Sequence, residues 1–398
     1  MERENRSDKG FLAIDCLSGQ VFHYGDNLEI NKAGQLSGDN KSVLPYAGPG
    51  LIDLQINGIN GIDFNSVSLN CEGMVSAANY LLSKGVTTFF PTVITNTEEN
   101  TRYILSVINE ACHKNALLDR CIGGIHLEGP FISPADGYRG AHNKDLVRAP
   151  DWNLFLNYQK VSGGRIKIIT LSPEWENSTG FIKKCREEGL LATIAHSRAT
   201  PVQINASVDA GVALASHIGN GLPLEIPRHP NVLWEILASE KIYISLIADG
   251  FHLPDSFIRV VLKVKMDKAI LVSDATCFSG LAPGVYKSPI GSEVLLEANG
   301  RLSMNNGRGL LAGATRTLLE NVQYMVCNNL ADLRGAWYMA SAGPRRLIKE
   351  NIHLNDPGDK DLVLFNYEEG EIVVSEVFKN GKSAWRRQDR PKEDSLMD

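Results

Sequence analysis

Short apolar runs alternate along most of the chain with segments in which apolar residues recur at helical spacing. The runs predict eight strands, at 51–56, 87–92, 122–127, 166–171, 191–195, 212–216, 242–248 and 269–273. The helical spacing predicts helices at 71–83, 99–114, 178–188, 201–210, 231–239 and 254–264. This alternation indicates βα units, a parallel sheet and right-handed crossovers. Because the strands are apolar throughout, we expect both faces of the sheet to be covered.

Eight βα units predict an α/β protein with a closed (β/α)8 TIM-like barrel, although an open doubly wound sheet has the same local pattern. Shorter β-like runs, separated by turn residues, lie near both ends of the chain, at 11–14, 20–24, 361–365 and 371–378. Ala47-Gly48-Pro49-Gly50 marks a boundary between the two patterns. We therefore expect residues 1–48 and 356–398 to form a small β-sandwich domain and residues 49–355 to form the barrel.

Composition and charge exclude several classes of function. The 43% hydrophobic and 22% charged residues are typical of a soluble globular protein, and the net charge of -6 argues against a nucleic-acid partner. Apolar runs fall short of a membrane span, and the polar first ten residues lack a signal-peptide core. Seven scattered cysteines without a Cys-x-x-Cys pair favour reduced thiols. We expect a cytoplasmic protein that binds neither nucleic acid nor membrane.

Metal-binding residue types follow several of the predicted strands. Glu128 follows the third strand, His196 the fifth and His217 the sixth. In a barrel, the carboxyl ends of the strands build the active site, so these three side chains should meet. One carboxylate and two imidazoles can hold a divalent metal and leave a position open for water. Asp274, after the eighth strand, would reach the same centre as a general base.

Each of these residues also has a purely structural interpretation. A single His near a strand end is more often a hydrogen-bonded structural residue, and a lone Asp before Ala-Thr more often forms a cap or turn. Four such residues at the ends of four strands are harder to explain in this way, so the set carries the prediction. His126 lies within the third strand, and we expect it to support the ligands or the core rather than bind metal.

The residues at the strand ends resemble the amidohydrolase superfamily and, within it, the N-acetylglucosamine-6-phosphate deacetylase family. The resemblance runs from Pro49 to about Gly313 and rests on residues 49–58, 126–130, 140–143, 195–200, 216–217, 247–252, 273–275 and 311–313. Many superfamily members have a His-x-His pair after the first strand. Here those positions hold Gln55 and Asn57, as in single-metal members of the family.

Binuclear relatives often also need a Lys at the end of the fourth strand. Residues 170–174 read Thr-Leu-Ser-Pro-Glu and contain none. Both departures favour a single metal. The resemblance assigns its ligands to Glu128, His196 and His217.

The resemblance also implies roles for other residues. Asp274 matches the catalytic acid/base, His142 the His that orients the carbonyl, and His252 a His that faces the substrate. Further substrate contacts are expected at Ala141, Asn220, Gly221, Leu311, Ala312 and Gly313. The phosphate-binding Arg, which the family takes from the neighbouring subunit, best matches Arg228. Residues 218–230 differ from the usual pattern around that Arg, and a surface residue beside two prolines is the alternative for Arg228.

The resemblance implies a metal-dependent hydrolase of amino-sugar catabolism that converts N-acetylglucosamine 6-phosphate to glucosamine 6-phosphate and acetate. It implies a homodimer with one divalent metal ion per subunit, with Zn²⁺ as first choice and Fe²⁺, Mn²⁺, Co²⁺ or Ni²⁺ as alternatives. One alternative function is deacylation of another N-acyl sugar or an N-acyl amino acid, which the unusual loop at 220–230 motivates. Another is a non-catalytic amidohydrolase-like binding protein, which the presence of all four central residues disfavours.

Overall fold

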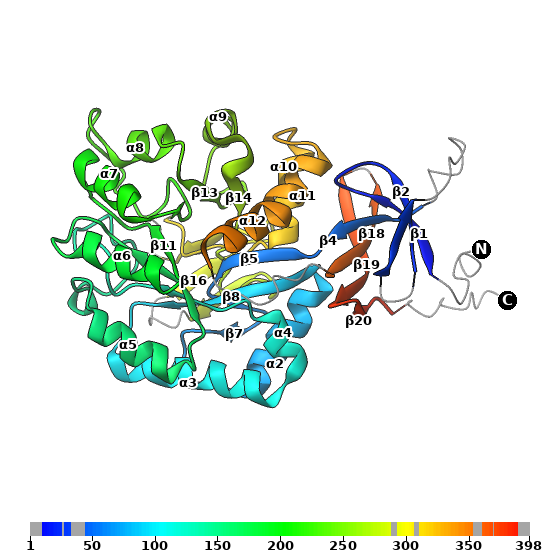
Figure 1. The fold of residues 1–398 in the computed structure, drawn as a ribbon, viewed down its shortest axis with the longest axis horizontal. Coiled ribbons are helices and arrows are strands. Elements are labelled where there is room, and N and C mark those ends of the chain that lie inside the picture. The colour runs from blue at the N-terminus through cyan, green and yellow to red at the C-terminus, as the bar shows by residue number, and fades with distance from the viewer. Residues whose placement is uncertain are drawn as a thin grey trace.

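An eight-stranded parallel sheet forms the centre of the molecule. The computed structural model describes residues 10–25, 28–32, 44–287, 293–305, 310–352, 360–368 and 370–388. The strand order is β14-β13-β12-β11-β10-β9-β8-β5, with helices around the outside (Figure 1). The strands are β5 (Leu51–Ile56), β8 (Val86–Ile94), β9 (Ile125–Glu128), β10 (Ile166–Leu171), β11 (Leu191–Ile194), β12 (Leu214–Ala215), β13 (Tyr243–Leu246) and β14 (Ala269–Leu271).

Hydrogen bonds just beyond the end of β14 close the seam between the last and the first strand. The backbone N–H of Asp274 donates to the carbonyl oxygen of Gln55 at 2.9 Å. The buried carboxylate of Asp53 accepts the N–H of Ser273 at 3.1 Å. These contacts make the sheet a nearly closed barrel and confirm the predicted (β/α)8 fold.

The helices on the outside of the barrel are α2 (Cys71–Ser83), α3 (Glu98–Lys114), α4 (Ala116–Cys121), α5 (Trp152–Val161), α6 (Ser178–Glu187), α7 (Pro201–Ala210), α8 (Val232–Ala238), α9 (Asp255–Lys265), α10 (Leu318–Cys327), α11 (Leu333–Ala340) and α12 (Ala342–Asn351). Six of the helices, α2, α3, α6, α7, α8 and α9, correspond to predicted helices, whereas α4, α5, α10, α11 and α12 do not appear among the predicted elements. Local chemistry sets their ends. At α7, Thr200 and Gln203 form a capping box, Pro201 takes the first helical position, and Gly211 ends the helix with a φ of 126°.

The third barrel strand begins later than predicted. Its predicted start, Ile122, makes only an isolated bridge to Phe89, and β9 begins at Ile125. Gly123 and Gly124 lie between, and a Cβ on Gly123 would approach the ring of Phe90 to 2.7 Å. The two glycines therefore allow close packing of the chain before the ladder starts.

Segments from both ends of the chain form a second sheet, in the order β20-β19-β18-β4-β1-β2-β3. Its strands are β1 (Phe11–Asp15), β2 (Val21–Tyr24), β3 (Ile30–Lys32), β4 (Tyr46–Pro49), β18 (Leu362–Glu368), β19 (Glu371–Lys379) and β20 (Lys382–Arg386). The rings of Phe11 and Phe378 stack with centroids 5.9 Å apart, although β4 and β18 separate their strands within the sheet. The sheet therefore curls over an apolar core of its own.

This sheet confirms the predicted small β unit built from the two ends of the chain. Residues 1–9, 26–27, 33–43, 356–359, 369 and 389–398 of the predicted domain lie outside the described residues. The domain limits at 48/49 and 355/356 stay predictions.

A buried ion pair joins the small sheet to the barrel. Lys379 Nζ lies 2.7 Å from Asp361 Oδ2 and donates to the hydroxyl of Thr88, in β8, at 3.1 Å. Lys379 and Asp361 are both buried. Thr88 stands near the start of its strand, so the small sheet packs at the amino-terminal ends of the barrel strands (Figure 1).

Replacing Lys379→Met is expected to lower the free energy of unfolding by about 3–5 kcal/mol, because Asp361 would stay buried without its partner. Urea unfolding of both proteins would measure the change. Lys241→Met is the matched control, since Lys241 pairs with Asp209 on the surface, where both side chains are more than 70% exposed. A loss no larger than that of the control would contradict the anchoring role.

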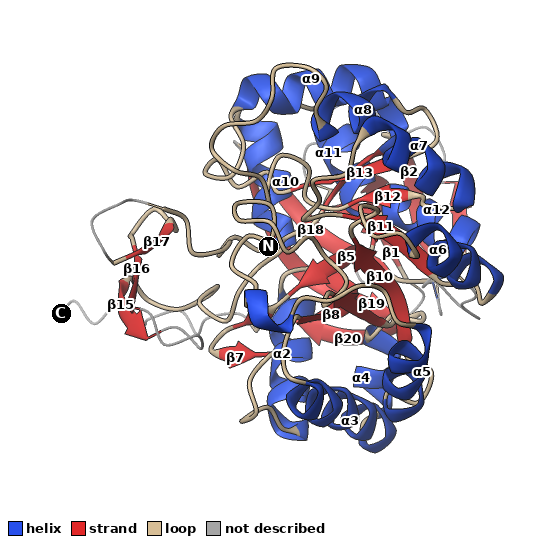
Figure 2. Cartoon of the chain, turned by 90° about the vertical axis from the view of Figure 1, so that its left-hand side faces the viewer, coloured by secondary structure: helices blue, strands red, loops and turns tan. Residues whose placement is uncertain are grey.

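A three-stranded antiparallel sheet, inserted between β14 and α10, does not appear among the predicted elements. It consists of β15 (Gly284–Lys287), β16 (Glu293–Leu296) and β17 (Leu302–Met304), and Figure 2 shows it standing apart from the barrel. Beyond it, Leu311 bridges Ser303, and Ala314 bridges Ala275. After the insertion, the chain therefore pairs again with Ala275, the residue that follows Asp274.

Two expectations from composition concern cysteines and membranes. All seven cysteines lie within the described residues, and none forms a disulfide. Among the described helices, none combines the length and the apolar character that a membrane span requires.

Candidate metal centre

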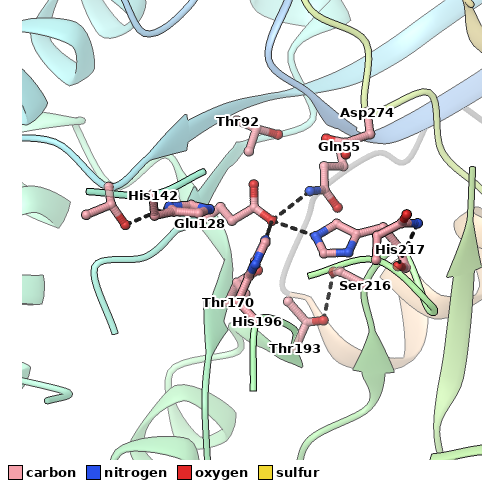
Figure 3. Close-up of polar contacts among 12 residues, drawn as sticks. Gln55, Thr92, Glu128, His142, Thr170, Thr193, His196, Ser216, His217 and Asp274 are labelled. Atoms are coloured by element: carbon pink, nitrogen blue, oxygen red, sulfur yellow. Dashed lines mark hydrogen bonds and ion pairs between the residues drawn. The ribbon is translucent and has the colours of Figure 1, made fainter. Parts of the chain in front are cut away.

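Glu128, His196 and His217 come together at the carboxyl end of the barrel. Glu128 ends β9, and the two histidines stand just beyond β11 and β12. Glu128 Oε1 lies 2.9 Å from His217 Nε2 and 3.4 Å from His196 Nε2. The three donor atoms lie within 4.8 Å of one another. Figure 3 shows both imidazoles directed at the same carboxylate oxygen, so the predicted convergence of these residues is observed.

The backbone at this centre adopts conformations that the local sequence does not favour. His196, His217 and Asp274 have φ values of 47°, 33° and 48°. Residues other than glycine rarely adopt these values and do so where the surrounding structure enforces them. The N–H of His217 donates to Ser245 Oγ at 2.7 Å, which fixes one of these turns. The barrel therefore imposes the turns that aim these side chains into its mouth.

The orientation of His196 depends on its neighbours. Its Nδ1 donates to the carbonyl oxygen of Tyr138 at 3.1 Å, which directs Nε2 toward Glu128. A Cβ on Gly221, where φ is 64°, would lie 2.6 Å from His196 Nδ1. Glycine at 221 therefore allows the loop to pack directly against the imidazole.

Gln55 and Asn57 contact the two carboxylates of the site. Gln55 Nε2 donates to Glu128 Oε1 at 2.9 Å, and Asn57 Nδ2 donates to Asp274 Oδ1 at 2.7 Å. Three further buried atoms, Gln55 Oε1, Asn57 Oδ1 and His217 Nδ1, have no hydrogen-bond partner among the described residues. Buried polar atoms without partners are costly, so these atoms are suited to contact a polar ligand.

Electrostatics at the centre favour positive charge. Burial by itself would raise the pKa of Glu128, but hydrogen bonds from His196 and His217, and their charges, hold that pKa well below its usual range. Burial would lower the pKa of His217, yet the hydrogen bond and charge of Glu128 raise it to about 9. Glu128 is therefore ionised, and a cation beside it would take the place of the proton on the imidazole.

Asp274 and His142 flank this cluster. Burial, with the nearby charge of Glu128, raises the pKa of Asp274 to about 6, against the opposing effect of His217. The ring of His142 meets that of His196 edge to face, with centroids 4.6 Å apart. Burial and the charge of His196 lower the pKa of His142 to about 3, so this imidazole is neutral at neutral pH. Its Nδ1 lies 2.9 Å from Thr95 Oγ1.

The hydroxyl of Thr95 is a contact that the sequence did not suggest. Thr95 follows β8, outside the segments that carry the family resemblance. A threonine after an apolar strand is common, so the only available signal was its place at a carboxyl strand end.

Hydrogen bonds also fix the side chains of two further histidines, His252 and His126. His252 Nδ1 lies 2.7 Å from Asp249 Oδ2, and its backbone N–H donates to Asp249 Oδ1 at 2.9 Å. His126 Nδ1 donates to the carbonyl oxygen of Leu54 at 3.1 Å, and its Nε2 lies 2.7 Å from Thr170 Oγ1. Both nitrogens of His126 are therefore engaged beside the cluster.

The other predicted substrate residues lie on the surrounding loops. The backbone N–H and side-chain amide of Asn220 both donate to the carbonyl oxygen of His217, at 3.0 and 3.2 Å. Ala141 lies exposed beside His142, and Arg228 lies exposed on the loop between β12 and α8. Leu311, Ala312 and Gly313 are half-buried and run beside the loop after β14.

The donor set fits one divalent cation. Two imidazole nitrogens and an ionised carboxylate oxygen face a common point and suit divalent metals. The fold and this cluster together indicate a divalent metal site.

Comparison with known proteins identifies the family. The chain is 32% identical over 280 residues to the N-acetylglucosamine-6-phosphate deacetylase of Bacillus subtilis, which is 70% of this chain and 69% of that protein. The chain belongs to the N-acetylglucosamine-6-phosphate deacetylase family. It is also 29% identical to the Caenorhabditis elegans deacetylase over 354 residues, covering 86% of this chain and 83% of that one. No protein-family model matches the chain.

Solved deacetylases share the fold of this family member. The Pasteurella multocida deacetylase superposes with a TM-score of 0.78 at 25% identity, covering 93% of this chain and 97% of that chain. The Mycobacterium smegmatis deacetylase in complex with N-acetyl-D-glucosamine-6-phosphate superposes with a TM-score of 0.78 at 21% identity, covering 94% and 99%. Both extend over the barrel and the small sheet.

Proposed function

We propose that this protein removes the acetyl group from N-acetylglucosamine 6-phosphate and releases glucosamine 6-phosphate and acetate. The observation that carries the proposal is the convergence of Glu128, His196 and His217 at the barrel mouth, in a chain 32% identical to a deacetylase of that specificity. The reaction is hydrolysis of an amide, for which a divalent metal and an adjacent proton acceptor are suitable catalysts.

Glu128, His196 and His217 would hold a single metal ion. Zn²⁺ is our first choice for two imidazoles and one carboxylate, with Fe²⁺, Mn²⁺, Co²⁺ and Ni²⁺ as alternatives. When bound, the ion would polarise the acetamide carbonyl and lower the pKa of water. Gln55 donates to the ligand carboxylate and would fix its orientation.

Asp274 would move the proton. The hydrogen bond from Asn57 occupies Oδ1 and holds the carboxylate in place, so Oδ2 would accept the proton of the attacking water. The same proton would then pass to the leaving sugar nitrogen, because amine expulsion needs an acid. A pKa of about 6 suits both steps near neutral pH.

His142 would stabilise negative charge on the carbonyl oxygen. We assign its Nδ1 as the acceptor from the Thr95 hydroxyl, which places the hydrogen on Nε2. A neutral imidazole that donates through Nε2 can bind the developing oxyanion. The edge-to-face contact with His196 keeps this ring beside the ligand cluster.

The surrounding loops would bind the sugar phosphate. We assign sugar contacts to Ala141, Asn220, Gly221, His252, Leu311, Ala312 and Gly313. The exposed side chain of Arg228 makes no ion pair within the described part of the chain, so it is available for a phosphate contact in a neighbouring subunit. That arrangement would require a homodimer.

Acetate release from a panel of acetylated compounds tests the function. We expect the purified protein, with its metal content measured on the same preparation, to act faster on N-acetylglucosamine 6-phosphate than on N-acetylglucosamine or an N-acetyl amino acid. Preference for one of the unphosphorylated compounds would establish the alternative deacylase. A metal-loaded protein that releases no acetate from any of them would indicate a non-catalytic relative.

The dependence of kcat/KM on pH tests the role of Asp274. Because the carboxylate form is the proton acceptor, kcat/KM should fall as the pH is lowered through about 6, where Asp274 becomes protonated. A cation nearby stabilises the carboxylate, so the acid limb would lie at or somewhat below this pH. Enzyme held at each pH and returned to pH 7.5 controls for inactivation. A rate independent of pH between 4.5 and 7.5 would contradict this role.

A further inference from the structure

Arg316, just before α10, lies between two aromatic rings. Its Cζ is 5.2 Å from the ring centroid of Phe251 and 5.5 Å from that of Tyr324. The residue is half-buried, and its guanidinium forms neither an ion pair nor a hydrogen bond with the described residues. Contacts with ring faces hold a guanidinium without using its N–H donors. Arg316 therefore offers a positioned cation whose donors are available to a ligand.

Other contacts fix the ring of Tyr324 and the backbone of Phe251. Tyr324 donates its hydroxyl to Asp255 Oδ1 at 2.8 Å. A Cβ on Gly250, where φ is 77°, would lie 2.5 Å from the ring of Tyr324, so the loop after β13 packs directly on that ring. The N–H of Phe251 donates to Asp249 Oδ1 at 2.9 Å. The aromatic clamp on Arg316 is thus part of the packed wall of the barrel mouth.

The clamp lies where the last two barrel loops meet. Phe251 immediately precedes His252 on the loop after β13, and Ala314, two residues before Arg316, bridges Ala275. The N–H of Thr276 donates to the carbonyl oxygen of Ala314 at 2.9 Å. In (β/α)8 barrels, phosphate groups are frequently bound by the loops after the seventh and eighth strands. Arg316 places a guanidinium at that location.

The start of α10 itself is already capped. The carboxylate of Glu320 accepts the N–H of Thr317 at 2.6 Å and its hydroxyl at 2.8 Å. The guanidinium of Arg316, rather than the N-terminus of α10, is therefore the group that is available to bind an anion.

We propose that Arg316 binds the phosphate group of the substrate from within the same subunit. This inference rests on the proposed function, and it names a cation in addition to Arg228 for the phosphate. A guanidinium matches two oxygens of a phosphate monoester with parallel N–H donors, which a sugar hydroxyl does not reproduce. If Arg316 binds the phosphate within one subunit, phosphate binding would depend less on Arg228. The loop that carries Arg228, at 218–230, departs from the family pattern.

Kinetics with N-acetylglucosamine 6-phosphate and N-acetylglucosamine, which differ only in the phosphate, would test the role of Arg316. Arg316→Met should lower kcat/KM for N-acetylglucosamine 6-phosphate by about 10- to 100-fold, the range for a hydrogen bond to a charged group. The value for N-acetylglucosamine should change less than about twofold. Arg316→Lys should restore part of the loss, and Arg334→Met, on the exposed surface of α11, should have no effect. Equal losses on both substrates would show that Arg316 only supports the clamp and would overturn the proposal.

Binding measured without turnover separates this proposal from the proposed function. By calorimetry on the metal-loaded full chain, Arg316→Met should weaken glucosamine 6-phosphate binding and leave that of glucosamine unchanged. A wild-type protein that binds glucosamine 6-phosphate through Arg316 but releases no acetate would refute the deacetylase function alone. An active wild type in which Arg228→Met, and not Arg316→Met, weakens this binding would refute the Arg316 subsite alone.

Discussion

Asp274→Asn is expected to lower kcat by about 10²- to 10⁴-fold and to leave the metal content unchanged, because a proton acceptor is lost while every proposed ligand stays. The amide keeps the shape of the carboxylate, and its oxygen can still accept the hydrogen bond from Asn57. It cannot take a proton from water or return one to the leaving nitrogen. Steady-state kinetics, with elemental analysis of the same sample, would measure both quantities.

The control for this variant is Asp209→Asn, which makes the same chemical change on an exposed residue of α7. It should retain wild-type turnover. If Asp274→Asn turned over at a near-normal rate, Asp274 would be a structural residue of the barrel seam, where its N–H bonds to Gln55. Loss of metal from Asp274→Asn would instead place this carboxylate among the ligands.

His196→Ala is expected to reduce bound metal from one ion per chain to a small fraction and to abolish turnover. Only Glu128 and His217 would then remain from the cluster, and two ligands hold a divalent ion weakly. Elemental analysis after dialysis would report the stoichiometry, and thermal unfolding would show that the variant is folded. His113→Ala, an exposed histidine on α3, is the matched control. A full complement of metal in His196→Ala would argue against ligation by this residue.

The barrel could be predicted because its signal is local. The strands β5 (Leu51–Ile56) and β10 (Ile166–Leu171) have the predicted bounds, since each is an apolar run buried along most of its length and ended by polar or turn residues. The convergence at the mouth follows from the same pattern, because Glu128 and the two histidines stand at the same end of parallel strands.

Features that depend on long-range contacts could not be predicted in this way. Nothing near Gln55 in the sequence indicates that its amide would reach Glu128, and nothing near Arg316 identifies Phe251 as its neighbour. The sheet of β15, β16 and β17 consists of strands of three or four residues, at or below the shortest run in which periodicity can be recognised.

The closing hydrogen bond between Asp274 and Gln55 couples assembly of the site to closure of the barrel. During synthesis, Gln55 and all three proposed ligands leave the ribosome before Asp274, and a domain generally folds as a unit once it has emerged. A nascent chain that stops short of β14 would lack the hydrogen bond that closes the seam, and β5 would remain an open edge. The proposed proton acceptor is thus also among the last residues to complete the barrel, so the cation site and the group that would use it would form in the same folding step.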